Sequence, residues 1–128
     1  MLVFNEAQVG EAIYTKLKTI SSSIYFDRAP RTATFPYAVF KLNSVFQREG
    51  ATSTFILSIN VWHNKGNNIT DLVTLQNDIL NGLHKGVYID VNMSLVFMLE
   101  SLLTINDPDE QLRRRQLEFV VEYNNRNV

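Results

Sequence analysis

The chain has 128 residues, the usual length of one domain, so we expect residues 1–128 to form a single unit. Its 12 Lys and Arg against 13 Asp and Glu give a net charge of −1, which argues against sequence-independent nucleic-acid binding. Apolar residues at 45% and charged residues at 20% exclude global disorder. Cysteine is absent, which excludes disulfides, thiolate metal sites and cysteine nucleophiles.

Membrane and secretion signals are also missing from the pattern. The longest uninterrupted apolar run, Leu95–Leu99, is far shorter than the roughly 20 residues that cross a bilayer. The first residues carry neither the basic nor the apolar region of a secretion signal. We therefore expect a soluble intracellular domain that does not contact membranes.

Two amphipathic helices are predicted. Apolar residues recur every three or four positions over residues 5–20, where Asn5 and Gln8 form a capping-box-like start. The same spacing over residues 69–84 predicts the second helix, with Asn67 or Asn68 as its N-cap.

The other segments alternate between apolar and polar residues, which favours strands. A hairpin is expected from a strand that begins at Pro36, a turn at Arg48–Ala51 and a strand around residues 54–61. Further strands are expected at 87–91, 93–105 and, in the last stretch, 114–123. We expect residues 24–36 to be irregular, because two prolines interrupt them, and the polar tail 124–128 to fray.

The resulting order, α-β-β-α-β-β-β, predicts an α+β fold. We expect one mostly antiparallel sheet of about four or five strands, with two α-helices packed on one face. The alternation of the last strand leaves its second face wet or in contact with a partner.

Catalytic motifs are not recognisable in the sequence. His63 and His84 stand at opposite ends of the second predicted helix, too far apart to share a metal, and we expect both at the surface or in caps. The dense carboxylate group Asp107, Asp109 and Glu110 could hold Mg²⁺ in a nuclease, but turn chemistry explains it more simply. We therefore predict no metal, no cofactor and no enzymatic activity, with a metal-dependent nuclease as the alternative.

Three consecutive arginines open the last predicted strand. Strand geometry sends Arg113 and Arg115 to one side and Arg114 to the other, so they do not form one basic patch. Contact with a phosphate backbone is one interpretation, and pairing with acids nearby or on a neighbouring subunit is the favoured one. Trp62 is expected in the core, together with Tyr37, Phe40 and Phe46, or alternatively as an interface anchor at the end of its strand.

Short motifs along the chain carry a resemblance to a known family. They are the A-x-x-x-x-L pattern of Ala12–Leu17, the basic–Pro element Asp27–Pro30, the Pro-Tyr strand Phe35–Phe40, the strand that starts at Ile56 and ends in Val61-Trp62-His63, the helical Leu75–Leu80, Asp107-Pro108, and the arginine-led last strand. Over residues 6–124 the chain resembles the tail-completion and tail-terminator proteins of long-tailed bacteriophages and prophages. That family has a sheet with helices on one face, in agreement with the pattern above.

The resemblance implies a structural, non-enzymatic protein of the virion. Such proteins form a ring, usually a homo-hexamer, that ends the tail tube and joins it to the head connector. The expected partners are other copies, the tail tube protein and the head–tail connector protein, with no membrane and no sequence-specific nucleic acid. The expected location is the tail or neck of the virion, and the bacterial host cytoplasm during assembly. A head–tail neck protein and a small intracellular binding domain unrelated to phage remain as alternatives.

Candidate interface residues follow from the loops that end the longest strands and from their charges. In a head-to-tail contact, the arginines of one subunit would face the carboxylates of the next. These candidates are the hairpin tip Arg48, Glu49 and Gly50, the acids Asp107, Asp109 and Glu110, and the arginines Arg113, Arg114 and Arg115.

Overall fold

A computed structural model describes residues 5–47, 52–64, 69–84, 86–105 and 112–126 of the chain. Helices and strands follow one another as α1 (Glu6–Lys18), β1 (Ile24–Phe26), β2 (Tyr37–Gln47), β3 (Thr52–His63), α2 (Thr70–Leu83), β4 (Val87–Ile89), β5 (Met93–Ile105) and β6 (Arg113–Asn125). No helix among these residues is both long and apolar enough to cross a membrane.

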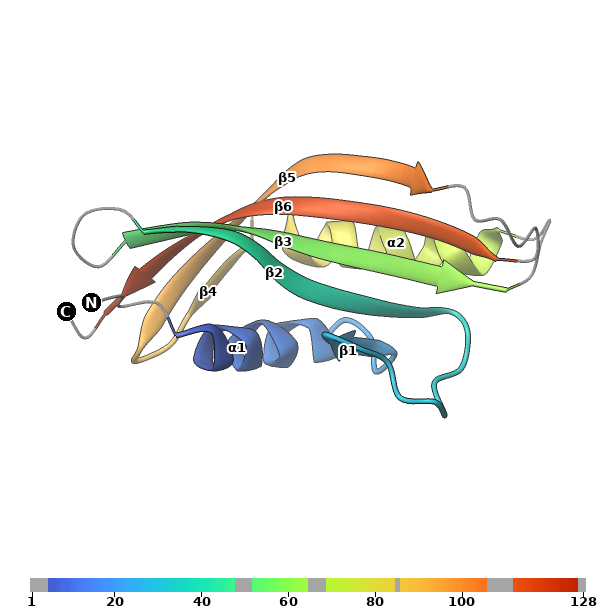
Figure 1. The fold of residues 1–128 in the computed structure, drawn as a ribbon, viewed down its shortest axis with the longest axis horizontal. Coiled ribbons are helices and arrows are strands. Elements are labelled where there is room, and N and C mark those ends of the chain that lie inside the picture. The colour runs from blue at the N-terminus through green and yellow to red at the C-terminus, as the bar shows by residue number, and fades with distance from the viewer. Residues whose placement is uncertain (1–4, 48–51, 65–68, 85, 106–111, 127–128) are drawn as a thin grey trace.

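The strands form one six-stranded sheet in the order β1-β2-β3-β6-β5-β4 (Figure 1). β1 pairs with β2 in parallel, and the other neighbours are antiparallel. Long strands and a strong twist give the sheet its curled shape in Figure 1. The predicted α+β class and mostly antiparallel sheet are confirmed, whereas the predicted number and order of strands are wrong.

The unexpected strand is β1, which lies in the segment predicted to be irregular. Ile24 is buried, and the Phe26 ring stacks on the Phe40 ring of β2 at 4.7 Å between centroids. The backbone amide of Ala38 donates to the carbonyl of Ser23 at 2.9 Å, which fixes the parallel register. Three residues carry too little alternation to reveal a strand, so its formation depends on packing against β2.

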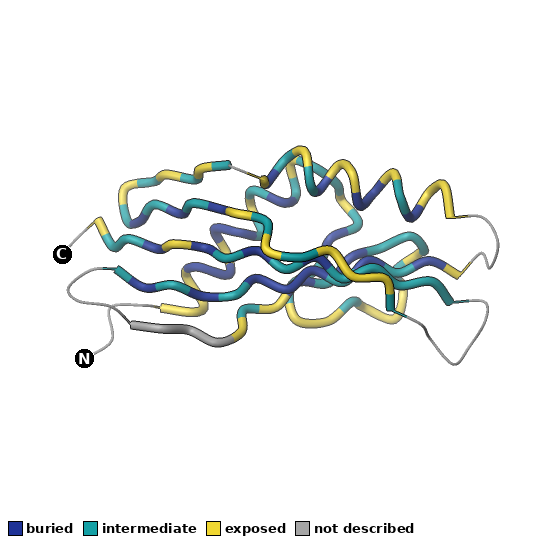
Figure 2. The backbone as a smooth tube through the Cα atoms, turned by 90° about the horizontal axis from the view of Figure 1, so that it is seen from above, coloured by how far each residue is buried: buried dark blue, intermediate teal, exposed yellow. Residues whose placement is uncertain are grey.

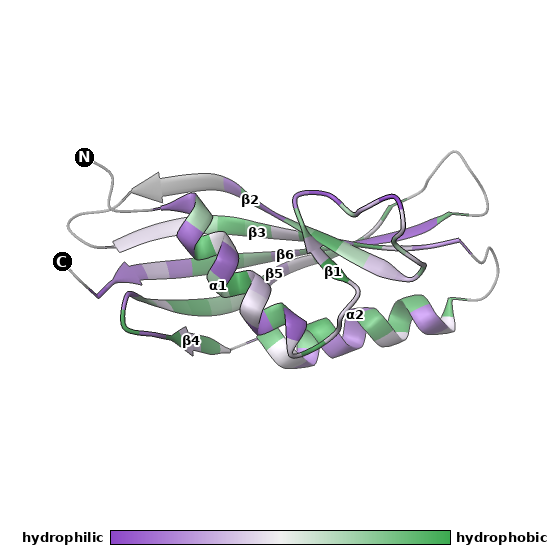
Figure 3. Ribbon diagram, turned by 90° about the horizontal axis from the view of Figure 1, so that it is seen from below, coloured by the Kyte–Doolittle hydropathy of each residue, from purple (hydrophilic) through white to green (hydrophobic). Residues whose placement is uncertain are grey.

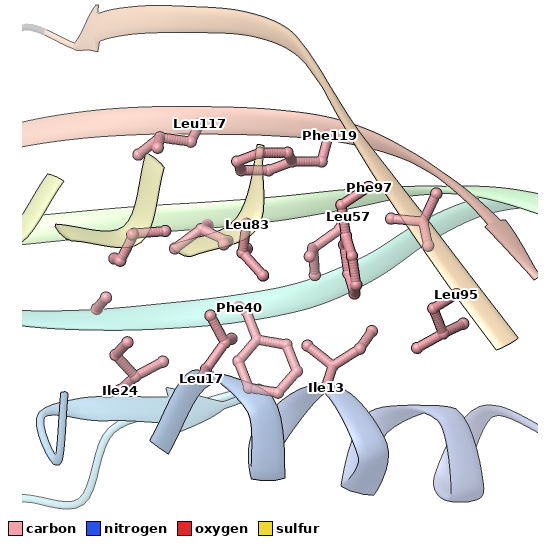
Figure 4. Packing of buried hydrophobic residues seen from close by; sticks show 14 of the residues in the cluster. Ile13, Leu17, Ile24, Phe40, Leu57, Leu83, Leu95, Phe97, Leu117 and Phe119 are labelled. Atoms are coloured by element: carbon pink, nitrogen blue, oxygen red, sulfur yellow. The ribbon is translucent and has the colours of Figure 1, made fainter. Parts of the chain in front are cut away.

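The two helices cover one face of the sheet, as predicted. Figure 3 shows both in front of the sheet when it is seen from below. Ile13 and Leu17 of α1 point towards Phe40 and Leu57 of the sheet in Figure 4. Residues of α2, Leu72 and Ile79 among others, belong to the same buried cluster. Burying each large apolar side chain stabilises the fold by about 1.5–3 kcal/mol, so this helix-covered face is where the stability lies.

The N-terminus of α1 has the predicted cap, whereas α2 has Ile69 at its N-cap position. The Asn5 side chain accepts a hydrogen bond from the Gln8 amide at 3.1 Å, which confirms the predicted N-cap of α1. α2 begins at Thr70 after Ile69, which makes no side-chain capping bond, while Asn67 and Asn68 lie outside the described residues. Packing of the apolar stripe is therefore the stabilisation of α2 that the described residues show.

The polar tail is more ordered than predicted. β6 continues to Asn125, because Asn124 pairs with Thr52 and Asn125 with Met93 on the two flanking strands. Thr52 Oγ1 donates a hydrogen bond to Asn124 Oδ1 at 2.7 Å. Backbone pairing does not require apolar side chains, which is why the polar composition misled the prediction.

Candidate functional site

The face of the sheet opposite the helices, here called the open face, carries the chemistry that a partner would meet. Cross-strand rows run over β2, β3 and β6: Tyr37 pairs with Trp62 and Trp62 with Arg114, while Val39 pairs with Asn60 and Asn60 with Gln116. Figure 2 shows the alternation of buried and partly exposed residues along these strands. The open face is therefore a mixed polar and aromatic surface.

A hollow of about 420 Å³ lies at one end of the open face, and we call it the Trp62 hollow. Its rim comes from the segment after β1, where Asp27 has a left-handed backbone (φ 67°) and turns the chain out of the strand. The hollow is lined by Asp27, Arg28, Ala29, Tyr37, Val39, Lys41, Asn60, Trp62 and Arg114. Segments far apart in the sequence thus meet in one hollow.

Arg114 is held in place within this hollow. Its guanidinium lies 4.8 Å from the centre of the Trp62 ring, and its Nε donates a hydrogen bond to Asn60 Oδ1 at 2.9 Å. Tyr37 extends the aromatic wall through an edge-on contact with Tyr25 at 6.4 Å and a tilted one with Phe35 at 5.1 Å. The stack on Trp62 and the hydrogen bond to the Asn60 side chain fix the plane of the guanidinium. The group is therefore ordered before a ligand binds.

The expectation that Trp62 and Tyr37 lie in the core is wrong. Both are half-buried on the open face, whereas Phe40 is fully buried and the side chain of Phe46 lies outside the described residues. Val61 is buried on the helix-covered side, so strand alternation directs Trp62 to the other side. The Trp62–Arg114 pair itself was not predicted, because finding it requires the register between β3 and β6.

The three arginines separate as their alternation predicted. Arg113 pairs with His63 and Arg115 with Val61, which places both on the helix-covered side, opposite Arg114. A small hollow of about 180 Å³ beside Ile69 is lined by Arg113 and Arg115 and also by part of Arg114, which lies between them on the strand. The other candidate interface residues, Arg48, Glu49, Gly50, Asp107, Asp109 and Glu110, lie outside the described residues, so no pairing with the arginines is tested.

One exposed strand edge was not predicted. β4 pairs only with Ser94–Val96 of β5, so in the described structure the later half of β5 has β6 as its sole strand neighbour. Leu102 and Leu103 in that half are 41% and 45% exposed, and this stretch is mostly yellow in Figure 2. An exposed apolar edge strand is a template for pairing with another chain.

The two histidines have different environments, and neither belongs to the Trp62 hollow. His63 is 1% exposed and neither of its ring nitrogens has a hydrogen-bond partner among the described residues, so the expectation of a surface or cap position is wrong for it. Asp71 Oδ2 lies 3.9 Å from its Nε2. His84 is exposed at the end of α2, and its Nδ1 accepts a hydrogen bond from the Leu99 amide at 3.2 Å.

Asp90 accepts three hydrogen bonds from described residues, and these bonds give its carboxylate a structural role. It accepts from the Tyr88 hydroxyl at 2.8 Å and from the backbone amides of Asn92 and Met93 at 2.7 and 2.9 Å. Partial burial by itself would raise the pKa of Asp90, but these bonds and the charge of Arg126 lower it below its ordinary value. The residue fixes the turn between β4 and β5. Within the described residues, no group of three or more His, Asp or Glu side chains is arranged to hold a metal.

Comparison with known proteins extends the description of the fold. No family model matches the chain, and no curated protein matches it. A solved structure does match: a chain described as "Virion of native gene transfer agent (GTA) particle", with a TM-score of 0.79 and 14% sequence identity. The match covers 94% of this chain and 98% of that chain. The chain therefore shares, over nearly its whole length, the fold of a chain from a gene transfer agent virion.

Proposed function

We propose that this chain is a structural protein of a phage or prophage virion that forms a ring at the end of the tail tube and joins it to the head connector. The observation that carries the proposal is the shared fold with a chain of a gene transfer agent virion over 94% of the sequence. The sequence resemblance to tail-completion and tail-terminator proteins supplies the place in the tail. The protein would act in the particle, after assembly in the host cytoplasm.

The strand edges support a contact between copies. At one side of the sheet, β1 pairs only with Ala38–Phe40 of β2, and at the other side β4 pairs only with Ser94–Val96 of β5. The remaining edges differ in chemistry, because Leu102 and Leu103 are exposed on β5 whereas Lys41 is exposed on β2. Two different surfaces suit a head-to-tail contact, which forms a ring when its rotation closes. The family resemblance sets the expected number at six.

Charged loops complete the proposed contacts. Arg113, Arg114 and Arg115 of one subunit would approach Asp107, Asp109 and Glu110 of the next, and the hairpin tip with Arg48, Glu49 and Gly50 would meet tail tube or connector proteins. Each exposed ion pair contributes only about 0–1 kcal/mol, so such a ring is sensitive to salt and concentration. The proposal assigns the chain no catalytic step and no cofactor.

The oligomeric state tests the ring. Light scattering at high protein concentration and low salt should show a hexamer, and electron microscopy should show six-fold rings, either free or on added tail tubes. Leu103→Lys should remove the ring, because it places a charge on the exposed edge of β5. Val91→Lys is the matched control, since Val91 is 79% exposed in the turn before β5 and lies away from that edge.

Other outcomes separate the alternatives. Rings that bind connectors and not tail tubes would favour a neck protein. A chain that stays monomeric under both conditions, with tail tubes present, would contradict the ring. A micromolar magnesium site that disappears in Asp109→Ala would revive the nuclease alternative.

A further inference from the structure

The Trp62 hollow contains a cation whose position is set before any ligand arrives. Arg114 is half-buried, stacks on Trp62 and donates its Nε to Asn60. These contacts use one of its five N–H groups, so the others remain for a ligand. An arginine that is already ordered loses little conformational entropy when it binds a carboxylate.

The charges of the hollow are unbalanced in favour of cations. Arg28, Lys41 and Arg114 all line it, against one carboxylate, that of Asp27. The structure gives no ion pair of these three cations with another described residue; the contact of His63 Nε2 with Asp71 Oδ2, at 3.9 Å, lies on the other side of the sheet. None of the three cations therefore has a carboxylate partner within the described part of the chain.

We propose that the Trp62 hollow is a docking site for an acidic peptide segment of another protein. Carboxylates of the segment pair with Arg114 and Lys41, and an apolar part of it packs against the rings of Trp62 and Tyr37. Arginine and tryptophan together are the residues that most often dominate binding energy in protein interfaces. The site shares Arg114 and Lys41 with the contacts proposed for the ring, so it is tested on dilute, monomeric protein in which those contacts are not made.

The surroundings favour a peptide over a nucleic acid. Glu118 and Glu122 follow Arg114 on the open face of β6, and Asp27 lies in the hollow itself. A phosphate backbone that ran along the strand would meet these carboxylates, and the chain as a whole has a charge of −1. A short acidic segment needs only the local cluster of cations.

Trp62 is the single tryptophan of the chain, so its fluorescence reports on the hollow directly. The experiment titrates dilute, monomeric protein at low salt with an acetylated and amidated hexaglutamate peptide, and calorimetry provides a second measurement. We expect a saturable change with a Kd of about 0.1–3 mM, the weak affinity that a few partly exposed ion pairs give. Hexalysine should give no saturable change.

Variants locate the binding in the hollow. Arg114→Gln should weaken binding by about tenfold and Lys41→Gln by about threefold, in line with the loss of a pre-ordered and of an exposed ion pair. Arg114→Lys should fall between wild type and Arg114→Gln, because it keeps the charge without the planar fork. Lys16→Gln on α1 is the matched control and should leave the affinity unchanged.

Four results would overturn the proposal. The first is the absence of a saturable change up to about 10 mM peptide, and the second is a loss of peptide affinity in Lys16→Gln equal to that in Arg114→Gln. The third is tighter binding of a six-nucleotide thymidine strand than of hexaglutamate. The fourth is peptide binding that emerges only when Asp107, Asp109 and Glu110 are neutralised together. The third would indicate a nucleic-acid surface, and the fourth would assign the hollow to the chain's own acidic segment. This test does not measure oligomerisation. Peptide binding can therefore be absent while the proposed ring forms, and the ring can be absent while the peptide binds.

Discussion

The two faces of the sheet use neighbouring residues of the same strands for different purposes. On β6, Leu117 and Phe119 are fully buried under the helices, while Gln116 and Glu118 between them are partly exposed on the open face. Every described apolar residue of β6 on the helix-covered side belongs to the core cluster, whereas the open face holds the fixed Arg114. Folding and partner binding are therefore separable one residue at a time, because a strand alternates its side chains.

The largest expected effect comes from breaking the helix-covered face. Phe119→Ala should lower the free energy of unfolding by about 3–5 kcal/mol, because it leaves a cavity where a fully buried ring packs. Val120→Ala changes the next residue, which is half-buried on the open face, and should cost about 1 kcal/mol or less. Urea denaturation of both variants measures the difference. Equal losses would mean that the two faces do not differ in their contribution to stability.

A smaller effect is expected where α1 packs closely on the sheet. A Cβ atom on Gly10 would lie 2.2 Å from Cε2 of Phe26, whose ring is held by its stack on Phe40. Gly10→Ala should therefore destabilise the fold by about 1–3 kcal/mol through overpacking, which exceeds the gain of about 1 kcal/mol in helix propensity. Thermal and urea unfolding provide the measurement.

Gly82 of α2 is the matched control for this substitution. Its added Cβ would meet Cδ1 and Cγ1 of Ile20 at 2.4 and 2.8 Å, but this side chain is only half-buried and no ring stack holds it. Because that side chain can rotate away, Gly82→Ala should be close to neutral, or stabilising by up to about 1 kcal/mol. A loss at Gly82 as large as that at Gly10 would contradict the role given to the Phe26–Phe40 stack.

A third change replaces a buried polar side chain of the helix-covered face by an apolar one. His63 is buried there, and within the described part of the chain neither ring nitrogen has a hydrogen-bond partner. Burial of an unpaired polar group costs about 1–3 kcal/mol, so His63→Leu should leave stability unchanged or raise it by about 1 kcal/mol. A clear loss of stability on denaturation would show that the imidazole makes a stabilising polar contact. His84→Leu is the comparison variant, since it removes the acceptor of the Leu99 amide.

His63 and Trp62 also show what the sequence could and could not predict. The alternation through Ile59 and Val61 continues to His63 and places it on the buried side. The two-residue period therefore predicts the side correctly, whereas the usual preferences of His for the surface and of Trp for the core do not. Helices and long strands were predicted because their periodicity is local. β1 was not, because three residues carry no usable period and their pairing with β2 is set by tertiary packing.

The candidate site was harder to predict than the fold. Trp62 and Arg114 meet only through the register of β3 and β6, which are separated along the chain by α2, β4 and β5. Strand alternation separates Arg114 from the other two arginines, but a local pattern carries no information that would pair Arg114 with the Trp62 ring. The exposure of the later half of β5 likewise could not be predicted, because it results from the shortness of β4. In the sequence, the apolar residues of that half look like those of a core strand.

Arg114 is expected to contribute little to stability, although its effect on binding is expected to be large. Its stack on Trp62 is partly exposed, and such cation–π contacts contribute about 0.5–1 kcal/mol. Arg114→Gln should therefore lower the free energy of unfolding by no more than about 1 kcal/mol. A double-mutant cycle with Trp62→Phe should give a coupling energy of about 0.5 kcal/mol, measured by urea denaturation with circular dichroism. A coupling of several kcal/mol would make Arg114 a structural residue, and the loss of peptide binding in its variants would then have to be attributed to local unfolding. A small coupling with an intact fold would mean that the loss of peptide binding comes from the missing contacts of Arg114 on the open face.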